Sequence, residues 1–356
     1  MGPRLTYAGA GVSLEAGEDA VRRIAEAVRS TRRPEVIGDL GGFAGLFALP
    51  AGRFRQPVLV ASTDGVGTKA QLTEAAGRYD TIGIDLVAMC ADDVVCTGAE
   101  PLFLLDYVAV GHVDPGQVEA VVRGVADGCR QAGMALLGGE VAEHPGERGL
   151  DLAGTAVGWA ERDALVGPEL VRSSDRLIGL ESNGLRSNGY SLARQALLEA
   201  ARRPLDGPAW PGAAHSLADE LLRPSAIYAP AVVAAVAVGG VHAVAHITGG
   251  GIPGNLARVL PPTCDAAIEW GSWEVPRVFV EVQRAGQVDS SEMAKVFNLG
   301  LGMILAVERE RAREVATTLE GFGHRAWNVG EIVAGKGTVR FEPGLAIGGG
   351  GGGGAG

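Results

Sequence analysis

The distribution of apolar positions divides the chain into segments of two kinds. Between Asp80 and Thr97 apolar residues recur at spacings of three and four, which is the period of an amphipathic helix. Pro57–Ala61 is instead a short, continuous apolar run, which is typical of a buried strand. Segments of these two kinds alternate along nearly the whole chain. This alternation predicts a mixed fold of the α/β (α+β) class.

The same patterns predict the remaining elements. Helices are expected near residues 18–31, 80–97, 115–132, 189–202, 215–222, 228–238, 253–260 and 309–321. Strands are expected near residues 57–61, 102–110, 134–137, 152–160, 176–181, 241–246, 265–270, 301–307 and 326–333. No repeat of about 20–50 residues is visible, which argues against solenoid and propeller folds.

A polar, turn-rich stretch at residues 162–175 separates two halves of similar character. We therefore expect an amino-terminal domain over residues 1–170 and a carboxy-terminal domain with a mixed sheet over residues 171–345. Residues 346–356 are almost all glycine, and we expect a disordered Gly-rich tail there.

Composition and charge exclude some partners. The formal net charge of −11 argues against a nucleic-acid-binding surface, which needs clustered Lys and Arg. No apolar stretch reaches the roughly 18 residues that a membrane span requires, so no membrane partner is expected. The four cysteines form no Cys-x-x-Cys pair, and the amino terminus has no signal pattern. These features predict a cytoplasmic protein.

The first candidate for chemistry is the segment Ser62–Leu72, STDGVGTKAQL. Its glycines would let backbone N–H groups approach an anion, and Lys69 would add a point charge. The spacing does not match a Walker loop, and Asp64 would repel a phosphate unless a cation lay between them. From these residues alone, a phosphate-binding loop and an ordinary turn both remain open.

Acidic residues lie on the apolar helix that follows. Asp92 and Asp93 are adjacent, and no Lys or Arg occurs between Tyr79 and Pro101. Buried carboxylates without a cation would suit a divalent ion, and hard oxygen ligands favour Mg²⁺. The alternative is that one or both carboxylates face solvent.

Two further turns follow predicted strands. Gly138, Gly139 and Glu140 come after the strand expected at 134–137, where α/β proteins bind ligands. An exposed Gly-Gly turn is the competing interpretation. Ser187–Tyr190 joins a strand to a helix, so its residues would either cap the helix or donate N–H groups to an anion.

The strongest segment is His246–Gly251, in which a strand runs into three glycines. Three successive glycines favour close approach of a ligand, since a simple turn does not need them. His246 would hydrogen-bond the substrate or transfer a proton, or serve only as a structural histidine. Gly300 and Gly302 alternate along an apolar strand, which favours close packing. Asn298, just before them, is a further candidate, and both a packing role and a contact with the ligand remain open for it.

Taken in order, several segments together resemble the phosphoribosylformylglycinamidine cyclo-ligase family, also called aminoimidazole ribonucleotide synthetases. The resemblance covers about residues 7–333. It rests on RRPEVIGDLGGFAGLFALP, STDGVGTK, DTIGIDLVAMCADDVVCTGAEPLFLLDY, LLGGEVAEHPG, SNGYSLAR, HITGGGIPGN and FNLGLGM.

The resemblance implies a reaction and a set of ligands. Such an enzyme uses ATP to close formylglycinamidine ribonucleotide to aminoimidazole ribonucleotide, releasing ADP and phosphate, in de novo purine biosynthesis. ATP would phosphorylate the formyl amide oxygen before the amidine nitrogen attacks that carbon. The resemblance also implies ATP, Mg²⁺, a small-molecule nucleotide substrate and a homodimer. The amino-terminal domain would contribute strands to a barrel at the dimer interface.

The implied site residues fall into four groups. The catalytic residues would be His246, Asp64 and Lys69. ATP or its phosphates would contact Thr63, Gly65, Val66, Gly67, Thr68, Lys69, Gly138, Gly139 and Glu140. The substrate would contact Ser187, Asn188, Gly189, His246, Thr248, Gly249, Gly250, Gly251 and Asn298. The metal ligands would be Asp64, Asp93 and Asp92.

The chain departs from the family pattern at a few positions. Asp92 stands where Asn is common, and Val141 where Thr is common. Arg186 stands where the family often has His, and Ala226 where it has Arg. Two rival functions remain: a related phosphotransferase, such as a selenophosphate or thiamine-phosphate enzyme, and a non-catalytic nucleotide-binding subunit. The combination of SNGYS and HITGGG argues against the first, and the carboxylates argue against the second.

Overall fold

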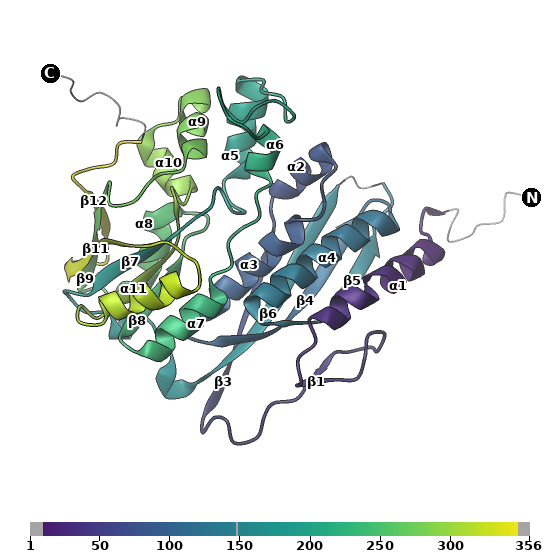
Figure 1. The fold of residues 1–356 in the computed structure, drawn as a ribbon, viewed down its shortest axis with the longest axis horizontal. Helices are drawn as coiled ribbons and strands as arrows, with labels where there is room; N and C mark the ends of the chain where they lie inside the picture. The colour runs from purple at the N-terminus through teal and green to yellow at the C-terminus, as the bar shows by residue number, and fades with distance from the viewer. Residues whose placement is uncertain (1–9, 147–148, 348–356) are drawn as a thin grey trace, which may run out of the picture. The chain divides into compact units, whose positions relative to one another are not determined.

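The computed structural model describes residues 10–146 and 149–347, and the chain divides into two compact units (Figure 1). Unit 1 comprises Met1–Val94 and Ala99–Ala164, and unit 2 comprises Val95–Gly98 and Leu165–Gly356. The predicted domain bounds, 1–170 and 171–345, stay predictions. Of the predicted tail, residues 348–356 lie outside the described residues.

Unit 1 is built on a four-stranded sheet with strand order β3-β6-β4-β5. Its helices are α1 (Leu14–Ser30), α2 (Lys69–Ala76), α3 (Ile82–Val95) and α4 (Pro115–Ala132). Its strands are β1 (Val36–Ile37), β2 (Leu46–Phe47), β3 (Pro57–Gly65), β4 (Glu100–Val110), β5 (Ala135–Glu143) and β6 (Leu150–Glu161). Strands β1 and β2 form a separate antiparallel pair.

The register of this sheet aligns four residues in one row. Strand β6 is antiparallel to both β3 and β4, and β4 is parallel to β5. Asp64 pairs with Gly154, Gly154 pairs with Asp106, and Asp106 pairs with Gly139. Residues paired across strands share a face of the sheet, so the two carboxylates lie on the same face.

Helices α3 and α4 pack on that face. The Leu86 side chain of α3 lies against Gly154, and the thiol of Cys90 contacts the Gly154 carbonyl oxygen. The opposite face carries exposed apolar side chains, including Leu59, Leu105 and Tyr107. Within residues 10–146 and 149–347 the strands form no closed barrel. The barrel expected at a dimer interface therefore stays a prediction.

Local sequence explains where α4 begins and ends. The Asp114 carboxylate caps the helix by accepting hydrogen bonds from the N–H groups of Gly116 and Gln117. Pro115 occupies the first helical position, where no N–H is needed. Gly133 ends the helix in the left-handed conformation, which glycine adopts without strain. The predicted bounds of this helix, 115–132, are confirmed.

Unit 2 contains a six-stranded sheet with strand order β12-β9-β11-β7-β10-β8, in which only β12 and β9 pair in parallel. Its strands are β7 (Arg176–Glu181), β8 (Val241–His246), β9 (Cys264–Glu269), β10 (Leu301–Val307), β11 (Ala326–Ala334) and β12 (Val339–Glu342). Its helices are α5 (Tyr190–Arg194), α6 (Leu217–Leu221), α7 (Ala229–Val238), α8 (Gly251–Leu256), α9 (Arg277–Gly286), α10 (Ser290–Val296) and α11 (Ala312–Gly321). A π-helical segment, Gln195–Ala200, continues α5.

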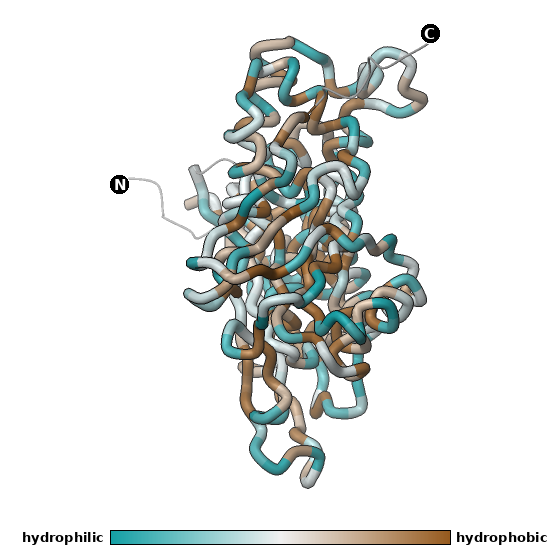
Figure 2. The backbone as a smooth tube through the Cα atoms, turned by 90° about the vertical axis from the view of Figure 1, so that its left-hand side faces the viewer, coloured by the Kyte–Doolittle hydropathy of each residue, from teal (hydrophilic) through white to brown (hydrophobic). Residues whose placement is uncertain are grey.

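The core of unit 2 lies between the sheet and α8. Ile252 and Leu256 of α8 pack with Ala245 of β8 and with Leu301 and Ile304 of β10. Helices α7 and α11 pack against each other near β7 and β8. Figure 2 shows brown, hydrophobic stretches along the backbone that alternate with teal, hydrophilic ones.

The predicted fold class is confirmed, and the structure corrects two boundaries. Ser62–Gly65 belong to β3 rather than to a loop, and Gly138–Glu143 continue β5 rather than following a strand end. The helices α9 and α10, the strand β12 and the hairpin β1–β2 were not predicted. No helix of residues 10–146 and 149–347 is both long and apolar enough to cross a bilayer.

Candidate functional site

The predicted phosphate-binding residues of unit 1 lie where β3 passes into α2. Thr63, Asp64 and Gly65 end the strand, and the N–H of Val66 still bonds to the Leu152 carbonyl oxygen at 3.2 Å. Gly67 has φ +56°, a conformation that favours glycine. No side chain caps the amino terminus of α2 at Thr68. The segment therefore offers backbone donors of the kind that bind anions.

Lys69 has a different environment from the one the sequence suggested. Its ammonium lies 2.7 Å from the Asp85 carboxylate, and both side chains have no exposed surface. Asp85 therefore has a buried cation beside it, although none occurs nearby in the sequence. A direct contact between Lys69 and phosphate stays a prediction, since the ion pair gives Lys69 a role in holding α2 against α3.

Asp64 and Asp93 both lie near one buried thiol. Cys90 of α3 contacts the backbone oxygen of Asp64 at 3.9 Å. Burial raises the pKa of the Cys90 thiol to about 12, and the charges of Asp64 and Asp93 act in the same direction. The Ser62 hydroxyl donates a hydrogen bond of 2.9 Å to Asp93. Two of the three predicted metal ligands therefore belong to one neighbourhood.

Asp92 points elsewhere on α3. It is fully buried and lies two turns from Asp85, so these two share a helix face that differs from the face of Asp93. Among the described residues no group of three or more His, Cys, Asp or Glu side chains is placed to hold a metal ion. The predicted metal site stays a prediction, with Asp64 and Asp93 as its better-placed members.

Gly138, Gly139 and Glu140 lie within β5, beside a buried acid of β4. A side chain at Gly139 would overlap the Asp106 carboxylate, which explains why this position needs glycine. Burial raises the pKa of Asp106 to about 7. Its Oδ2 has no hydrogen-bond partner within the described part of the chain. Asp106 was not predicted as a site residue, because a single acid in an apolar strand carries no local signal.

In unit 2 the predicted substrate residues converge from three segments. The Asn298 amide donates to the carbonyl oxygens of Gly184, at 2.9 Å, and Leu185, at 3.3 Å, just before the turn at Ser187. A side chain at Gly189 would overlap the Phe297 ring. Asn298 thus has a structural function in fixing the turn, which leaves its predicted substrate contact untested.

The glycine segment after β8 is held by an asparagine that was not predicted. The Asn255 amide nitrogen lies 3.2, 3.2 and 2.9 Å from the carbonyl oxygens of Thr248, Gly249 and Gly251. Gly251 has φ +61°, and a side chain there would overlap the Ala294 carbonyl oxygen. Asn255 belongs to the motif HITGGGIPGN, but its spacing alone did not reveal this function.

The turn and the glycine segment approach each other directly. A Cβ at Gly249 would lie 3.9 Å from the Asn188 amide nitrogen. His246 ends β8 opposite Met303 and is mostly buried. Ser187 is also buried, and its hydroxyl has no hydrogen-bond partner among the described residues. We call Ser187–Gly189, His246 and Thr248–Gly251 the substrate half-site.

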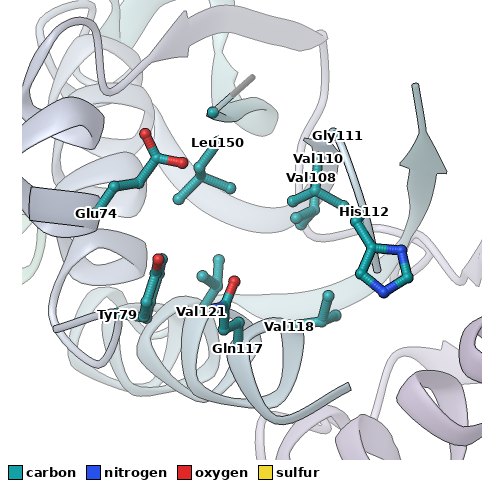
Figure 3. Close-up of a pocket in the computed structure, with 11 residues that line it drawn as sticks. Glu74, Tyr79, Val108, Val110, Gly111, His112, Gln117, Val118, Val121 and Leu150 are labelled. Carbon is teal, nitrogen blue, oxygen red and sulfur yellow. The ribbon is translucent and has the colours of Figure 1, made fainter. Parts of the chain in front are cut away.

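A cavity of about 310 Å³ in unit 1 lies away from all the predicted site residues. Figure 3 shows Glu74 and Tyr79 on one side of it and His112 on the other, with valine side chains between them. Gly149, which borders it, follows the undescribed residues 147–148.

The two units match two family models. The model described as AIR synthase related protein, N-terminal domain, matches residues 50–160, and the corresponding C-terminal domain matches residues 172–342. The fold and the two family models thus define an AIR synthase related protein.

Curated relatives narrow this class. Proteins named phosphoribosylformylglycinamidine cyclo-ligase cover 93% of this chain in three bacteria. That of Trichlorobacter lovleyi is 46% identical, that of Myxococcus xanthus 49% and that of Anaeromyxobacter dehalogenans 50%. The matches cover 95%, 97% and 96% of those proteins. The chain belongs to the phosphoribosylformylglycinamidine cyclo-ligase family. The assignment made from the motifs is confirmed, as is the prediction of an enzyme, a ligase of purine biosynthesis.

Solved structures share the fold at low identity. Thiamine-monophosphate kinase from Stenotrophomonas maltophilia superposes with a TM-score of 0.66 at 17% identity, covering 91% of this chain and 97% of that one. Hydrogenase Maturation Protein HypE in complex with ATP superposes with a TM-score of 0.64 at 18% identity, covering 94% and 92%.

Proposed function

We propose that this chain closes formylglycinamidine ribonucleotide to aminoimidazole ribonucleotide, with ATP converted to ADP and phosphate. An amide oxygen is a poor leaving group, and phosphorylation of the formyl oxygen turns it into phosphate, a good one. The amidine nitrogen then attacks the formyl carbon, and the C–O bond to phosphate breaks. The observation that carries the proposal is the 46–50% identity to cyclo-ligases over 93% of the chain.

ATP is assigned to the segments of unit 1. The start of α2, where the Thr68 side chain forms no cap, and the glycine at position 67 would supply backbone donors for a triphosphate. Gly138–Glu140 would contribute from β5. Support also comes from relatives of the same fold that were solved with ATP or with AMPPCP, namely HypE, a ThiL protein and a PurL protein. Lys69 would act by holding α2 in place through Asp85, and by attraction of the phosphates.

The ribonucleotide is assigned to the substrate half-site. The amide of Asn188 and the backbone N–H groups of Thr248–Gly250 suit a phosphate or the polar groups of a ribosylated amidine. The His246 imidazole is placed at the end of β8, where it would accept the amidine proton as the ring closes. The main contribution of these residues is orientation, since the reacting nitrogen and carbon belong to one molecule.

Mg²⁺ is assigned to Asp64 and Asp93. Their carboxylates are hard oxygen donors that border the same buried thiol, and the Ser62 hydroxyl orients Asp93. When bound, the ion would neutralise charge on the ATP phosphates. Asp64 would then attract the triphosphate through the ion instead of repelling it.

A homodimer is assigned to the open face of the unit 1 sheet. Leu59 is 61% exposed there, and Leu105 and Tyr107 are each 39% exposed. Exposed apolar side chains on a sheet face mark an interaction surface. A cytoplasmic location is supported by the four cysteines, all of which are free thiols.

The reaction is tested with purified protein, formylglycinamidine ribonucleotide, ATP and Mg²⁺. We expect ADP and the diazotisable aminoimidazole to form in equal amounts, and neither to form when the ribonucleotide is omitted. ADP release that ignores the ribonucleotide, or no product with folded protein, contradicts the proposal.

A further inference from the structure

Arg186 is an unexpected cation beside the substrate half-site. It immediately precedes Ser187, yet its side chain is only 2% exposed. A guanidinium stays protonated in proteins, so the turn has a permanent positive charge beneath it. Burial of a charge is costly unless the surroundings compensate for it, so a buried arginine at this position points to a function.

The backbone at Arg186 is held in an unusual conformation. Its φ is +65°, which is uncommon for a residue other than glycine and costs free energy. The Asn298 amide fixes the two preceding carbonyl groups, those of Gly184 and Leu185. The φ angle of Arg186 and the hydrogen bonds to the two preceding residues therefore fix the direction in which its side chain leaves the backbone.

Two contacts fix the guanidinium itself. Its carbon lies 4.7 Å from the centre of the Tyr228 ring, and the Tyr228 hydroxyl donates a hydrogen bond of 2.6 Å to the Glu181 carbonyl oxygen. A Cβ at Gly302 would lie 2.8 Å from Arg186 Nη1 and would overlap the Tyr228 hydroxyl. The carbonyl of Gly302 in turn accepts from the N–H of Ile247 at 3.0 Å, next to His246.

The two departures from the family pattern, at positions 186 and 226, are connected through Tyr228. Arg186 stands where the family often has His, and Ala226 where it has Arg. Ala226 lies two residues from Tyr228, the residue on which the Arg186 guanidinium stacks. The chain therefore lacks a cation at position 226 and has one that reaches the same neighbourhood from position 186.

We propose that Arg186 is a positioning residue of the substrate half-site, which stacks on Tyr228, holds the Ser187–Gly189 turn against Gly302 and supplies a fixed positive charge for the phosphate-bearing substrate. It takes over the charge that the family pattern places at position 226. The inference rests on the proposed function, because it takes the ligand of this half-site to be a ribonucleotide.

The test compares KM for the two substrates in Arg186→Met. Loss of the charge raises KM for formylglycinamidine ribonucleotide by about tenfold or more, the size expected when one charge-assisted interaction is lost. KM for ATP changes by less than about twofold, because the ATP segments belong to unit 1. Arg186→Lys keeps the charge without the planar stack and gives an intermediate KM. A merely structural defect would not separate the two KM values.

A charge swap gives the second arm of the test. Arg186→His raises the ribonucleotide KM, and adding Ala226→Arg to that variant returns it toward the wild-type value. Arg277→Met is the matched control. The Arg277 guanidinium also stacks on an aromatic ring, that of Trp210 at 5.0 Å, but its side chain is 50% exposed. This control leaves both KM values unchanged.

The outcomes separate this inference from the proposed function. A wild-type protein that neither turns over nor binds the ribonucleotide in calorimetry contradicts the proposed function. An active wild type with an unchanged ribonucleotide KM in folded Arg186→Met contradicts the role of Arg186 alone. If Arg186→Met does not fold, Arg186→Lys and the swap decide: wild-type KM in Arg186→His, or no recovery on adding Ala226→Arg, overturns the inference.

Discussion

The ammonium of Lys69 and the carboxylate of Asp85 form an ion pair of 2.7 Å that is completely buried between α2 and α3. The pair joins the helix that follows the predicted phosphate-binding segment to the helix that carries Asp93. It thereby links the position of the proposed triphosphate-binding segment to that of Asp93, the proposed metal ligand, within unit 1. The consequence for stability can be measured separately from catalysis.

Lys69→Met should lower the free energy of unfolding by about 3–5 kcal/mol, because it leaves the Asp85 charge buried without its partner. Adding Asp85→Leu removes that charge and should restore most of the loss. Urea unfolding measures both variants. Arg55→Met is the control, since the Arg55–Asp163 pair is largely exposed and should contribute less than about 1 kcal/mol. Equal losses in Lys69→Met and Arg55→Met would contradict the buried pair.

Asp106 should make stability depend on pH. Burial raises its pKa from 3.8 to about 7. Between these values the unfolded chain loses the proton while the folded chain keeps it. The free energy of unfolding therefore falls as pH rises from about 4 to about 7. The total fall is about 1.4 kcal/mol for each unit by which folding raises the pKa of Asp106.

The variant Asp106→Asn cannot titrate, so its stability relative to wild type should grow across this window and level off above it. Urea unfolding at pH 5, 6, 7 and 8 gives the difference between the two proteins. Cys129, a titratable group near Asp106, is present in both proteins, so its contribution cancels. A difference that does not change with pH would rule out the raised pKa.

Asn255→Asp tests how the glycine segment is held. The substitution is nearly isosteric. It places a carboxylate oxygen next to three carbonyl oxygens that accept hydrogen bonds from the Asn255 amide in the wild type. We expect a loss of about 1–3 kcal/mol in unfolding free energy and a higher KM for the ribonucleotide. Asn328→Asp, on an exposed position of β11, is the matched control. Unchanged kinetics in Asn255→Asp would show that substrate binding does not need this segment fixed.

Asp93→Asn tests the metal assignment without an activity assay. Mg²⁺ that binds the folded protein raises its melting temperature, by an amount that grows with the logarithm of one plus the ratio of the free Mg²⁺ concentration to Kd. The rise should require at least about tenfold more Mg²⁺ in Asp93→Asn, since a neutral amide replaces a charged ligand. Asp163→Asn removes an exposed carboxylate and should behave as wild type. An identical Mg²⁺ response in Asp93→Asn and wild type would remove Asp93 from the site.

Periodicity predicted the long elements well, because their signal is local. Helix α4 and the strands β7, β8 and β10 have the predicted bounds. Helix α2 has no apolar stripe, so periodicity gave it no bounds. Its Lys69 is buried together with Asp85 of α3, a residue that is distant in the sequence. The extent of β5 was missed because two glycines interrupt its pattern, and the reason for one of them, the Asp106 carboxylate, lies on the neighbouring strand.

The candidate sites, like the helices and strands, could be predicted only where the signal is local in the sequence. The glycine segments are visible in the sequence, since few other functions need three glycines together. Asn255 and Asp106 are not, because each acts on residues that only the fold brings near. Arg186 was visible as a departure from a family pattern, but its relation to position 226 depends on its stacking on Tyr228, two residues from Ala226.

The central claim is that ATP activates the formyl oxygen of the ribonucleotide, and an isotope measures it directly. Substrate labelled with ¹⁸O at the formyl group is converted by the purified protein in unlabelled water with ATP and Mg²⁺, and the released phosphate is analysed by mass spectrometry. The account predicts one ¹⁸O atom in each phosphate formed. Phosphate without ¹⁸O, at the same yield of aminoimidazole ribonucleotide, would contradict it.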